Sequence, residues 1–84
     1  MVTLARTPQQ LGNAIRRARK QLALNQAELG QRSGLRQATV SLIEAGHPAA
    51  RLDTVLALLA ALDLELRVAP RTKQSSSDVG DWLD

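Results

Sequence analysis

The stretch that decides the fold, residues 24–46, reads LNQAELGQRSGLRQATVSLIEAG. Near its start, the side-chain oxygen of Asn25 can cap a helix, and Glu28, three residues later, can accept a hydrogen bond from the Asn25 amide. This reciprocal pattern satisfies two of the N–H groups that the first turn of a helix leaves without partners. It therefore predicts a short helix over residues 26–33.

The second half of the stretch predicts a turn and another helix. Gly34 can adopt the left-handed backbone conformation that ends many helices, and we expect Leu35 to turn inward after it. A helix with a polar face then follows over about residues 36–44. Two short helices joined by a tight turn form a helix-turn-helix, a motif whose second helix reads DNA.

Helical patterns also flank this stretch. Thr7 and Pro8 form a helix-start signal, and Gln10 is expected to complete a capping box with Thr7. Over residues 8–23 the apolar side chains recur with the 3.6-residue period of one helix face. A fourth helix is predicted over residues 52–62, where apolar side chains cover well over half of the circumference. The expected fold class is therefore mainly all-α.

The two short helices need tertiary packing, because isolated helices of this length are unstable in water. We expect Leu29, Leu35, Val40 and Ile43 to supply it. Gly30 lies inside the first of these helices, where it costs up to about 1 kcal/mol relative to Ala. A close helix crossing at Gly30 is the expected compensation.

The composition indicates one small domain with a basic body and a weakly acidic tail. The chain has no Cys, Phe or Tyr and a single Trp, so its core must be aliphatic and has no disulfide. Residues 1–69 hold nine Lys or Arg against five Asp or Glu, whereas residues 70–84 hold two against three. We expect a DNA-binding and dimerisation domain over the first range and a flexible tail over the second. Basic charge favours polyanionic partners, although a charge of this size is common among other proteins too.

Residues 64–68 (LELRV) alternate apolar and polar side chains, which predicts a short strand. Nothing else in the chain clearly supplies a ladder partner, so we expect the same strand of a second copy to pair with it across a two-fold axis. A fifth helix or coil is the alternative for so short a segment. Part of the helix over residues 52–62 would also stay exposed in a monomer. The expected homodimer interface comprises Leu56, Leu58, Leu64, Leu66 and Val68.

The tail contains three apolar side chains among serines, glycine and charged residues. Val79, Trp82 and Leu83 are out of place in such a segment. Trp is strongly enriched among binding hot spots, so the three are candidates for an anchor that folds onto a partner. The alternative is that Trp82 folds back on its own domain or has no binding role.

Little in the sequence favours catalysis. The single His, His47, has no Cys beside it and no orienting acid, and the glycines form no phosphate-binding loop. We therefore expect no enzymatic activity, no metal and no cofactor. The longest apolar run is far shorter than the roughly 20 residues that span a membrane, and the start of the chain lacks a signal-like segment. A cytoplasmic protein without membrane association is expected.

Residue types in the predicted motif suit contacts with double-stranded DNA. Gln26, at the start of the first short helix, can offer its amide to a phosphate that also faces the helix N-terminus. In the second helix Gln37 suits a bidentate pair with adenine, Arg36 suits guanine or phosphate, and Ser41 suits a base edge or phosphate. Ala38 and the methyl group of Thr39 can touch a thymine methyl. The alternative is that this polar face is simply solvated.

An acidic residue in the last turn of the second helix needs a partner. Glu44 opposes the helix dipole there and would repel DNA. Arg19, in the helix over residues 8–23, is the candidate partner. We expect Arg19 and Glu44 to form a partly buried, structural ion pair.

These residues carry a resemblance. Arg19, the segment LNQAEL, the turn Ser33-Gly34-Leu35 and the segment RQATVSLIEAG resemble the phage-repressor and Cro type of helix-turn-helix, the XRE family. The wider layout is similar to HipB-type antitoxins of type II toxin–antitoxin systems. Shared features are a TPQQL-like opening, RQATVS, LDTVLALLAALDLEL before a terminal strand, and a polar tail that ends near a Trp.

The resemblance implies a compact lambda-repressor-like domain of four to five helices and a homodimer whose C-terminal strands pair. It also implies an autorepressor that binds operator DNA in the bacterial cytoplasm, at the nucleoid, and whose protein partner is a HipA-type serine/threonine kinase toxin. The family pattern places Arg36, Gln37, Ala38 and Ser41 against bases and Gln26 and Thr39 against the DNA backbone. Leu42 departs from this pattern, because some repressors have a polar base reader at that position. A stand-alone regulator without a toxin and a protein-interaction module are the alternatives.

Overall fold

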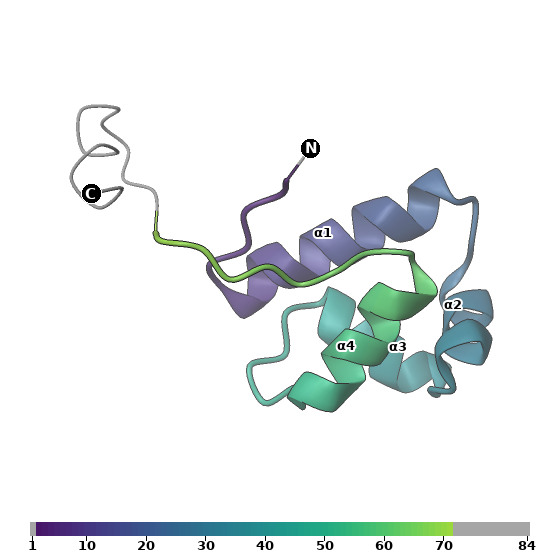
Figure 1. The fold of residues 1–84 in the computed structure, drawn as a ribbon. Helices are drawn as coiled ribbons and strands as arrows, with labels where there is room; N and C mark the ends of the chain where they lie inside the picture. Colours follow the sequence, from purple (N-terminus) through teal and green to yellow (C-terminus); the bar gives the residue numbers. More distant parts are fainter. Residues whose placement is uncertain (1, 72–84) are drawn as a thin grey trace.

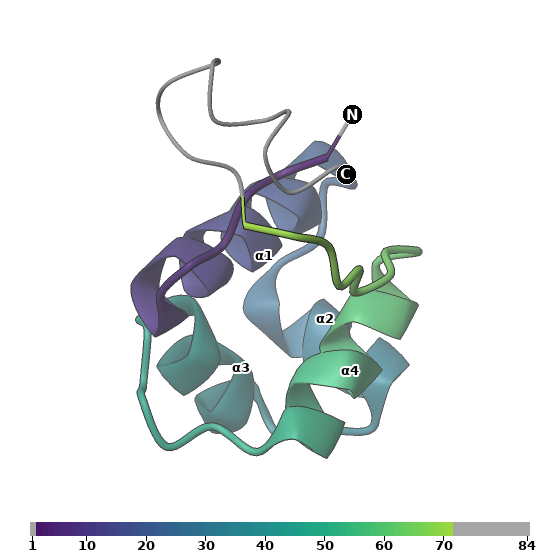
Figure 2. The same ribbon diagram turned by 60° about the vertical axis from the view of Figure 1, so that its left-hand side comes forward.

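The computed structural model describes residues 2–71 and contains four helices in that range. Helix α2 packs against both α3 and α4, and α1 packs against α3. Figure 1 shows α1 along one side of the molecule and the three shorter helices gathered on the other. The segment that follows α4 passes back over α1, as both ribbon views show (Figures 1 and 2). The helices are α1 (Pro8–Gln21), α2 (Gln26–Ser33), α3 (Gln37–Glu44) and α4 (Leu52–Ala61).

Local capping explains where α1 and α2 begin. The Asn25 side chain accepts a hydrogen bond from the Glu28 amide at 2.7 Å, and the Glu28 side chain accepts one from the Asn25 amide at 2.9 Å, which confirms the predicted capping box. Thr7 caps α1 by accepting from the Gln10 amide at 3.0 Å. The Gln10 side chain, however, accepts from the amide of Arg6 rather than that of Thr7, so the box predicted there is incomplete.

Helix α1 ends at Gln21, two residues earlier than the sequence predicts. Ala23 has a positive φ of 57°, which lies outside the helical region and turns the chain so that Leu24 enters the core. Leu22 was expected to extend the apolar stripe of α1, but its side chain is about half exposed because it already lies in this turn. The structure therefore corrects two predictions: α1 ends earlier than expected, and Leu22 is not part of its buried stripe.

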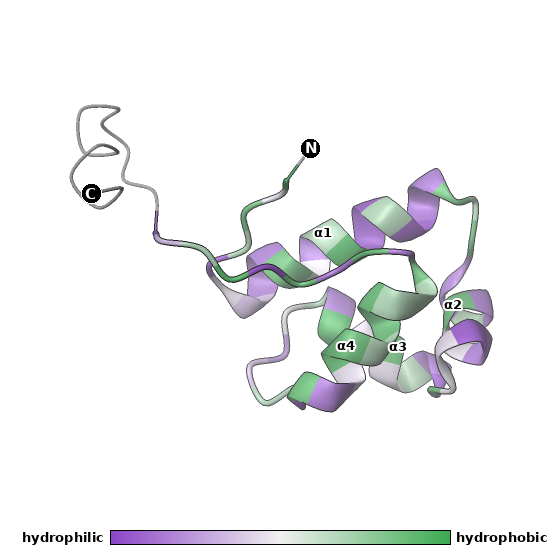
Figure 3. Ribbon diagram, in the orientation of Figure 1, coloured by the Kyte–Doolittle hydropathy of each residue, from purple (hydrophilic) through white to green (hydrophobic). Residues whose placement is uncertain are grey.

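The core is aliphatic, as the composition predicts. Figure 3 shows hydrophobic segments on α4 and alternating hydrophilic and hydrophobic segments on α1 and α2. Leu29, Val40 and Ile43 are buried as expected, and Leu35 is half-buried against them. The buried apolar residues are Ile15, Leu24, Leu29, Val40, Ile43, Val55, Leu58, Leu59 and Leu62.

The prediction that Leu58 lies at a dimer interface is wrong, because its side chain is 0% exposed. Val55, Leu58, Leu59 and Leu62 follow the spacing i, i+3, i+4 and i+7, which places them on one helix face. That face of α4 packs toward α2. Leu56 lies off this stripe and is exposed, as expected.

Residues 64–68 form neither a strand nor a helix in the single chain, and this part of the chain that the structure describes is coil. The side chains of Leu64, Leu66 and Val68 are exposed. A strand needs a ladder partner, which the prediction placed on a second copy. The pairing of two such segments therefore stays a prediction.

Gly30 lies against the turn rather than at a helix crossing. A Cβ atom at Gly30 would lie 2.7 Å from the carbonyl oxygen of Leu35. The Leu35 amide in turn donates to the Gly30 carbonyl at 2.8 Å. The glycine therefore allows the chain to fold back closely after α2, which corrects the expected helix crossing.

None of the helices described for residues 2–71 is long and apolar enough to cross a membrane. The tail residues proposed as an anchor, Val79, Trp82 and Leu83, lie outside the described residues.

Candidate nucleic-acid interface

The turn between α2 and α3 has the geometry that the sequence predicts. Gly34 ends α2 in the left-handed conformation, with a φ of 72° and ψ of 26°. Arg36 is extended, and α3 begins at the next residue. Together these two residues bring α3 back against α2, with which it packs.

Helix α3 separates an inner face from an outer one. Val40, Ile43 and Glu44 are buried. Gln37, Ala38 and Ser41, the expected base-reading residues of the helix, are all exposed. This division follows the helical period, since residues three and four apart share a face.

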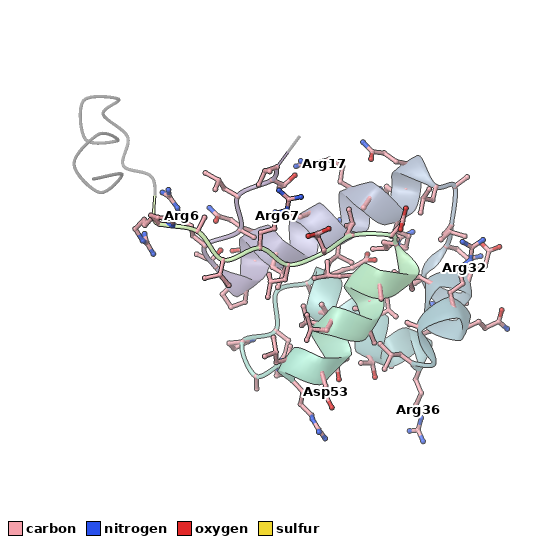
Figure 4. The ribbon with its side chains drawn as sticks, viewed as in Figure 1. Arg6, Arg17, Arg32, Arg36, Asp53 and Arg67 are labelled. Carbon is pink, nitrogen blue, oxygen red and sulfur yellow. The ribbon has the colours of Figure 1, made fainter. Side chains whose placement is uncertain are left out.

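Arg36 precedes α3 and is exposed at the same end of the helix. Figure 4 shows its guanidinium group extending away from the body of the molecule. Within residues 2–71 the side chains of Arg36, Gln37 and Ser41 make no hydrogen bond to another residue. Their donors and acceptors are therefore available to a ligand.

Thr39 lies at the flank of this surface rather than on it. Its side chain is half-buried and lines a shallow hollow of about 310 Å³ between α3 and the loop that leads to α4. Leu42, His47, Arg51 and Thr54 also line this hollow. Thr39, which was expected to contact the DNA backbone, thus lies at the edge of the exposed face of α3.

Gln26, also expected to contact the DNA backbone, lies at the first position of α2 beside the end of α3. Its side-chain nitrogen Nε2 donates to Oε1 of Glu44 at 3.2 Å. Gln26 and Ser41 line the same polar hollow, of about 270 Å³. The structure therefore brings the start of α2 and the outer face of α3 to one place.

Arg19 and Glu44 form a buried ion pair that joins α1 to α3. Nε of Arg19 donates to Oε2 of Glu44 at 2.7 Å, and Nη2 donates to Oε1 at 3.0 Å. The third nitrogen, Nη1, donates to the carbonyl oxygen of Leu24 at 2.8 Å. The hydrogen bond with Glu44 raises the pKa of Arg19, and this outweighs burial, which acts in the opposite direction. The guanidinium group of Arg19 is therefore charged, and each of its three nitrogens donates to an acceptor.

Sequence reasoning did not assign Arg16 to this surface. Its exposed side chain lines the polar hollow together with Gln26 and Ser41. The signal was its position three residues before Arg19, which places the two arginines on neighbouring turns of one helix face. Arg16 adds positive charge where the start of α2 meets α3.

The part of the chain that contains α2, the glycine turn and α3 matches a known family. The model of the helix-turn-helix family HTH_3 matches residues 15–68. The chain belongs to this family. None of the curated proteins compared with the chain matches it.

Solved structures of HipB are similar to the chain over most of its length. A complex of a HipB variant with an O2 20mer has 30% sequence identity and a TM-score of 0.79, and the match covers 86% of this chain and 100% of that one. A HipB–O4 20mer complex and a HipA–HipB–O2–O3 complex each have 30% identity, a TM-score of 0.78, and 84% and 100% coverage. The expected XRE-type family and HipB-like all-α fold are therefore confirmed.

The chain is thus a helix-turn-helix, DNA-binding regulator of the XRE type with a HipB-like structure. Such proteins typically act through binding rather than catalysis. In a helix-turn-helix the second helix is the one that lies in the major groove, and in this chain the second helix of the motif is α3.

Proposed function

We propose that the chain is an antitoxin and autorepressor, which binds operator DNA as a homodimer and neutralises a HipA-type serine/threonine kinase. The observation that carries the DNA half is the outer face of α3, whose polar side chains have no partner within residues 2–71. The similarity to HipB, which was solved in complex with DNA 20mers and with HipA, supports both halves. A bacterial cytoplasmic location at the nucleoid follows from this role.

Base reading is assigned to the outer face of α3 and the residue before it. Gln37 is exposed and suited to a bidentate contact with adenine, and Arg36 to guanine. Ala38 and Ser41 complete the base-reading set. Gln26 and Thr39, which flank this face, are assigned to the DNA backbone.

A homodimer fits the apolar side chains that the single chain leaves exposed. Leu56, Leu64, Leu66 and Val68 are all exposed, and three of them lie in the segment that follows α4. Exposed apolar groups of this kind commonly mark interfaces. We assign residues 1–69 to DNA binding and dimerisation, and residues 70–84 to a tail that carries the kinase anchor of Val79, Trp82 and Leu83.

The DNA assignment is tested by measuring affinity against salt concentration. The probe is a duplex selected by the protein from a pool of randomised 30-base-pair duplexes, as about three helical turns accommodate two half-sites. A DNA reader loses affinity steeply as salt rises, because it displaces counterions from phosphates. If no duplex is enriched and binding is absent even at low salt, the face of α3 serves a protein partner instead.

The kinase assignment is tested at the tail. Trp82 is the only aromatic residue, so protein labelled with 5-fluorotryptophan gives one ¹⁹F resonance. Addition of an unlabelled HipA-type kinase from the same genome should shift that resonance, and addition of the selected duplex alone should not. An unchanged resonance, together with unimpaired kinase activity, would identify a stand-alone regulator.

A further inference from the structure

Glu44 accepts three hydrogen bonds, although the single positive charge of Arg19 already balances its own charge. Arg19 donates twice to the carboxylate, at 2.7 and 3.0 Å. The third donor is Nε2 of Gln26, at 3.2 Å from Oε1. The Glu44 side chain is only 3% exposed, and it lines the polar hollow together with Gln26.

Arg19 offsets the repulsion that the Glu44 carboxylate would otherwise exert on nearby DNA phosphates. Its guanidinium group pairs with both oxygens of Glu44 and is itself only 10% exposed. A buried pair of opposite charges presents little net field to a ligand outside. The hydrogen bond from Gln26 is therefore not needed to neutralise Glu44, and its main effect is on the Gln26 side chain.

A glutamine at a helix start ordinarily samples several side-chain conformations in water, and ordering it on binding costs free energy. Gln26 is half-buried and tethered at Nε2, so part of that ordering is complete before any ligand binds. Its second Nε2 hydrogen remains as a donor. It lines the hollow beside Arg16 and Ser41, next to the start of α2.

We propose that Glu44 is a positioning residue for DNA binding, which acts by holding the Gln26 amide ready for a backbone phosphate. Arg19 neutralises the carboxylate so that Glu44 orients Gln26 without repelling DNA. The buried ion pair thus serves affinity as well as stability. This inference rests on the proposed contact between Gln26 and the DNA backbone.

The variant Glu44→Gln separates positioning from simple electrostatics by the sign of its effect. It removes one negative charge near DNA, so electrostatics alone predicts tighter binding. The new side chain has one acceptor oxygen instead of two, and the two Arg19 donors compete with Gln26 for it. Positioning therefore predicts weaker binding, by about 3- to 10-fold, because the Gln26 side chain must then be ordered when DNA binds.

The experiment measures dissociation constants of wild type, Glu44→Gln, Gln26→Ala and the double variant for the selected duplex. Urea denaturation of each variant gives the folded fraction, and constants are compared for folded protein only. We expect Gln26→Ala to weaken binding at least as much as Glu44→Gln, and the double variant to bind no more weakly than Gln26→Ala. Independent losses that multiply, or tighter binding by Glu44→Gln, would overturn the inference.

A measurement on unmutated protein covers the case in which Glu44→Gln does not fold. The Gln26 side-chain NH₂ signals are assigned in a ¹⁵N–¹H spectrum by their absence in Gln26→Ala. A tethered amide gives two proton signals more widely separated than those of an exposed control such as Gln21, and signals that coincide with the control overturn the inference. If the wild type binds no duplex at all, the proposed function itself fails. That result differs from every outcome that would overturn only the positioning role of Glu44.

Discussion

The backbone of Gly12 lies against the carbonyl oxygen of Glu44, so closely that a Cβ atom at Gly12 would be 2.6 Å from that oxygen. The same atom would also contact the Ile43 carbonyl oxygen. Both neighbours are backbone atoms, which cannot rotate away. The missing side chain at Gly12 therefore sets how closely α1 approaches the end of α3.

This contact predicts that Gly12→Ala destabilises the protein. Overpacking a tight contact costs about 1–3 kcal/mol. This exceeds the gain of up to about 1 kcal/mol that Ala gives over Gly within a helix. Urea denaturation checks the result, with Asn13→Ala as the control because Asn13 is exposed on the next position of α1. Equal or greater stability of Gly12→Ala would mean that the helices separate at little cost.

The ion pair predicts strong coupling between Arg19 and Glu44. Either single change to Ala leaves a buried charge without its partner and should cost about 3–5 kcal/mol. The double change should cost much less than the two losses added together, as a double-mutant cycle by urea denaturation will measure. Additive losses would show that the pair contributes nothing as a pair.

The raised pKa of Arg19 predicts how this coupling depends on pH. A cationic group whose pKa is higher in the folded state contributes stability below its unfolded pKa and loses it only as pH rises through the folded value. The contribution of Arg19 should therefore persist throughout the alkaline range below the ordinary pKa of an arginine. Stability curves of wild type and Arg19→Ala against pH should run parallel there, and convergence of the two curves would contradict the assignment.

Base reading predicts that Gln37→Ala costs about 1–3 kcal/mol on the selected duplex and relaxes specificity at one base pair. The measurement compares dissociation constants for that duplex and for a duplex of scrambled sequence. Gln21→Ala, an exposed glutamine at the end of α1, is the matched control. Equal losses on both duplexes would assign Gln37 to the backbone instead.

Dimerisation predicts that Leu66→Glu weakens self-association at least about tenfold, since burial of each Leu side chain contributes about 1.5–3 kcal/mol. Sedimentation at a series of concentrations measures the constant. Glu65 lies on the opposite face of the expected strand, so the control variant Glu65→Gln should leave association unchanged. If Leu66→Glu associates as wild type does, the segment over residues 64–68 is not the interface.

Structural features that depend only on residues close together in the sequence could be predicted from it. The capping box of Asn25 and Glu28 and the left-handed Gly34 need only residues within one turn, and they fix α2 and the turn correctly. The inner and outer faces of α3 follow from its helical period in the same way. The prediction for Leu58 failed because apolar side chains cover most of α4, so its sequence does not single out the face that meets the core.

Contacts between residues far apart in the sequence could be predicted only where a charged side chain needed an oppositely charged partner. Glu44 needed a cation, and Arg19 was identified on that ground. The hydrogen bond from Gln26 to Glu44 and the close approach at Gly12 depend on the angle and depth at which three helices meet. No local pattern encodes these quantities, so both were found only in the structure.

In the proposed function, the two faces of α3 separate the residues that keep the protein folded from the residues that select its DNA. Gln37 and Ala38 are exposed and lie outside the core, whereas Val40 and Ile43 are buried in it. After gene duplication, one copy can therefore acquire a new operator through a few outward substitutions while its stability is unchanged. The same separation allows related regulators to coexist in one cell without competing for each other's promoters.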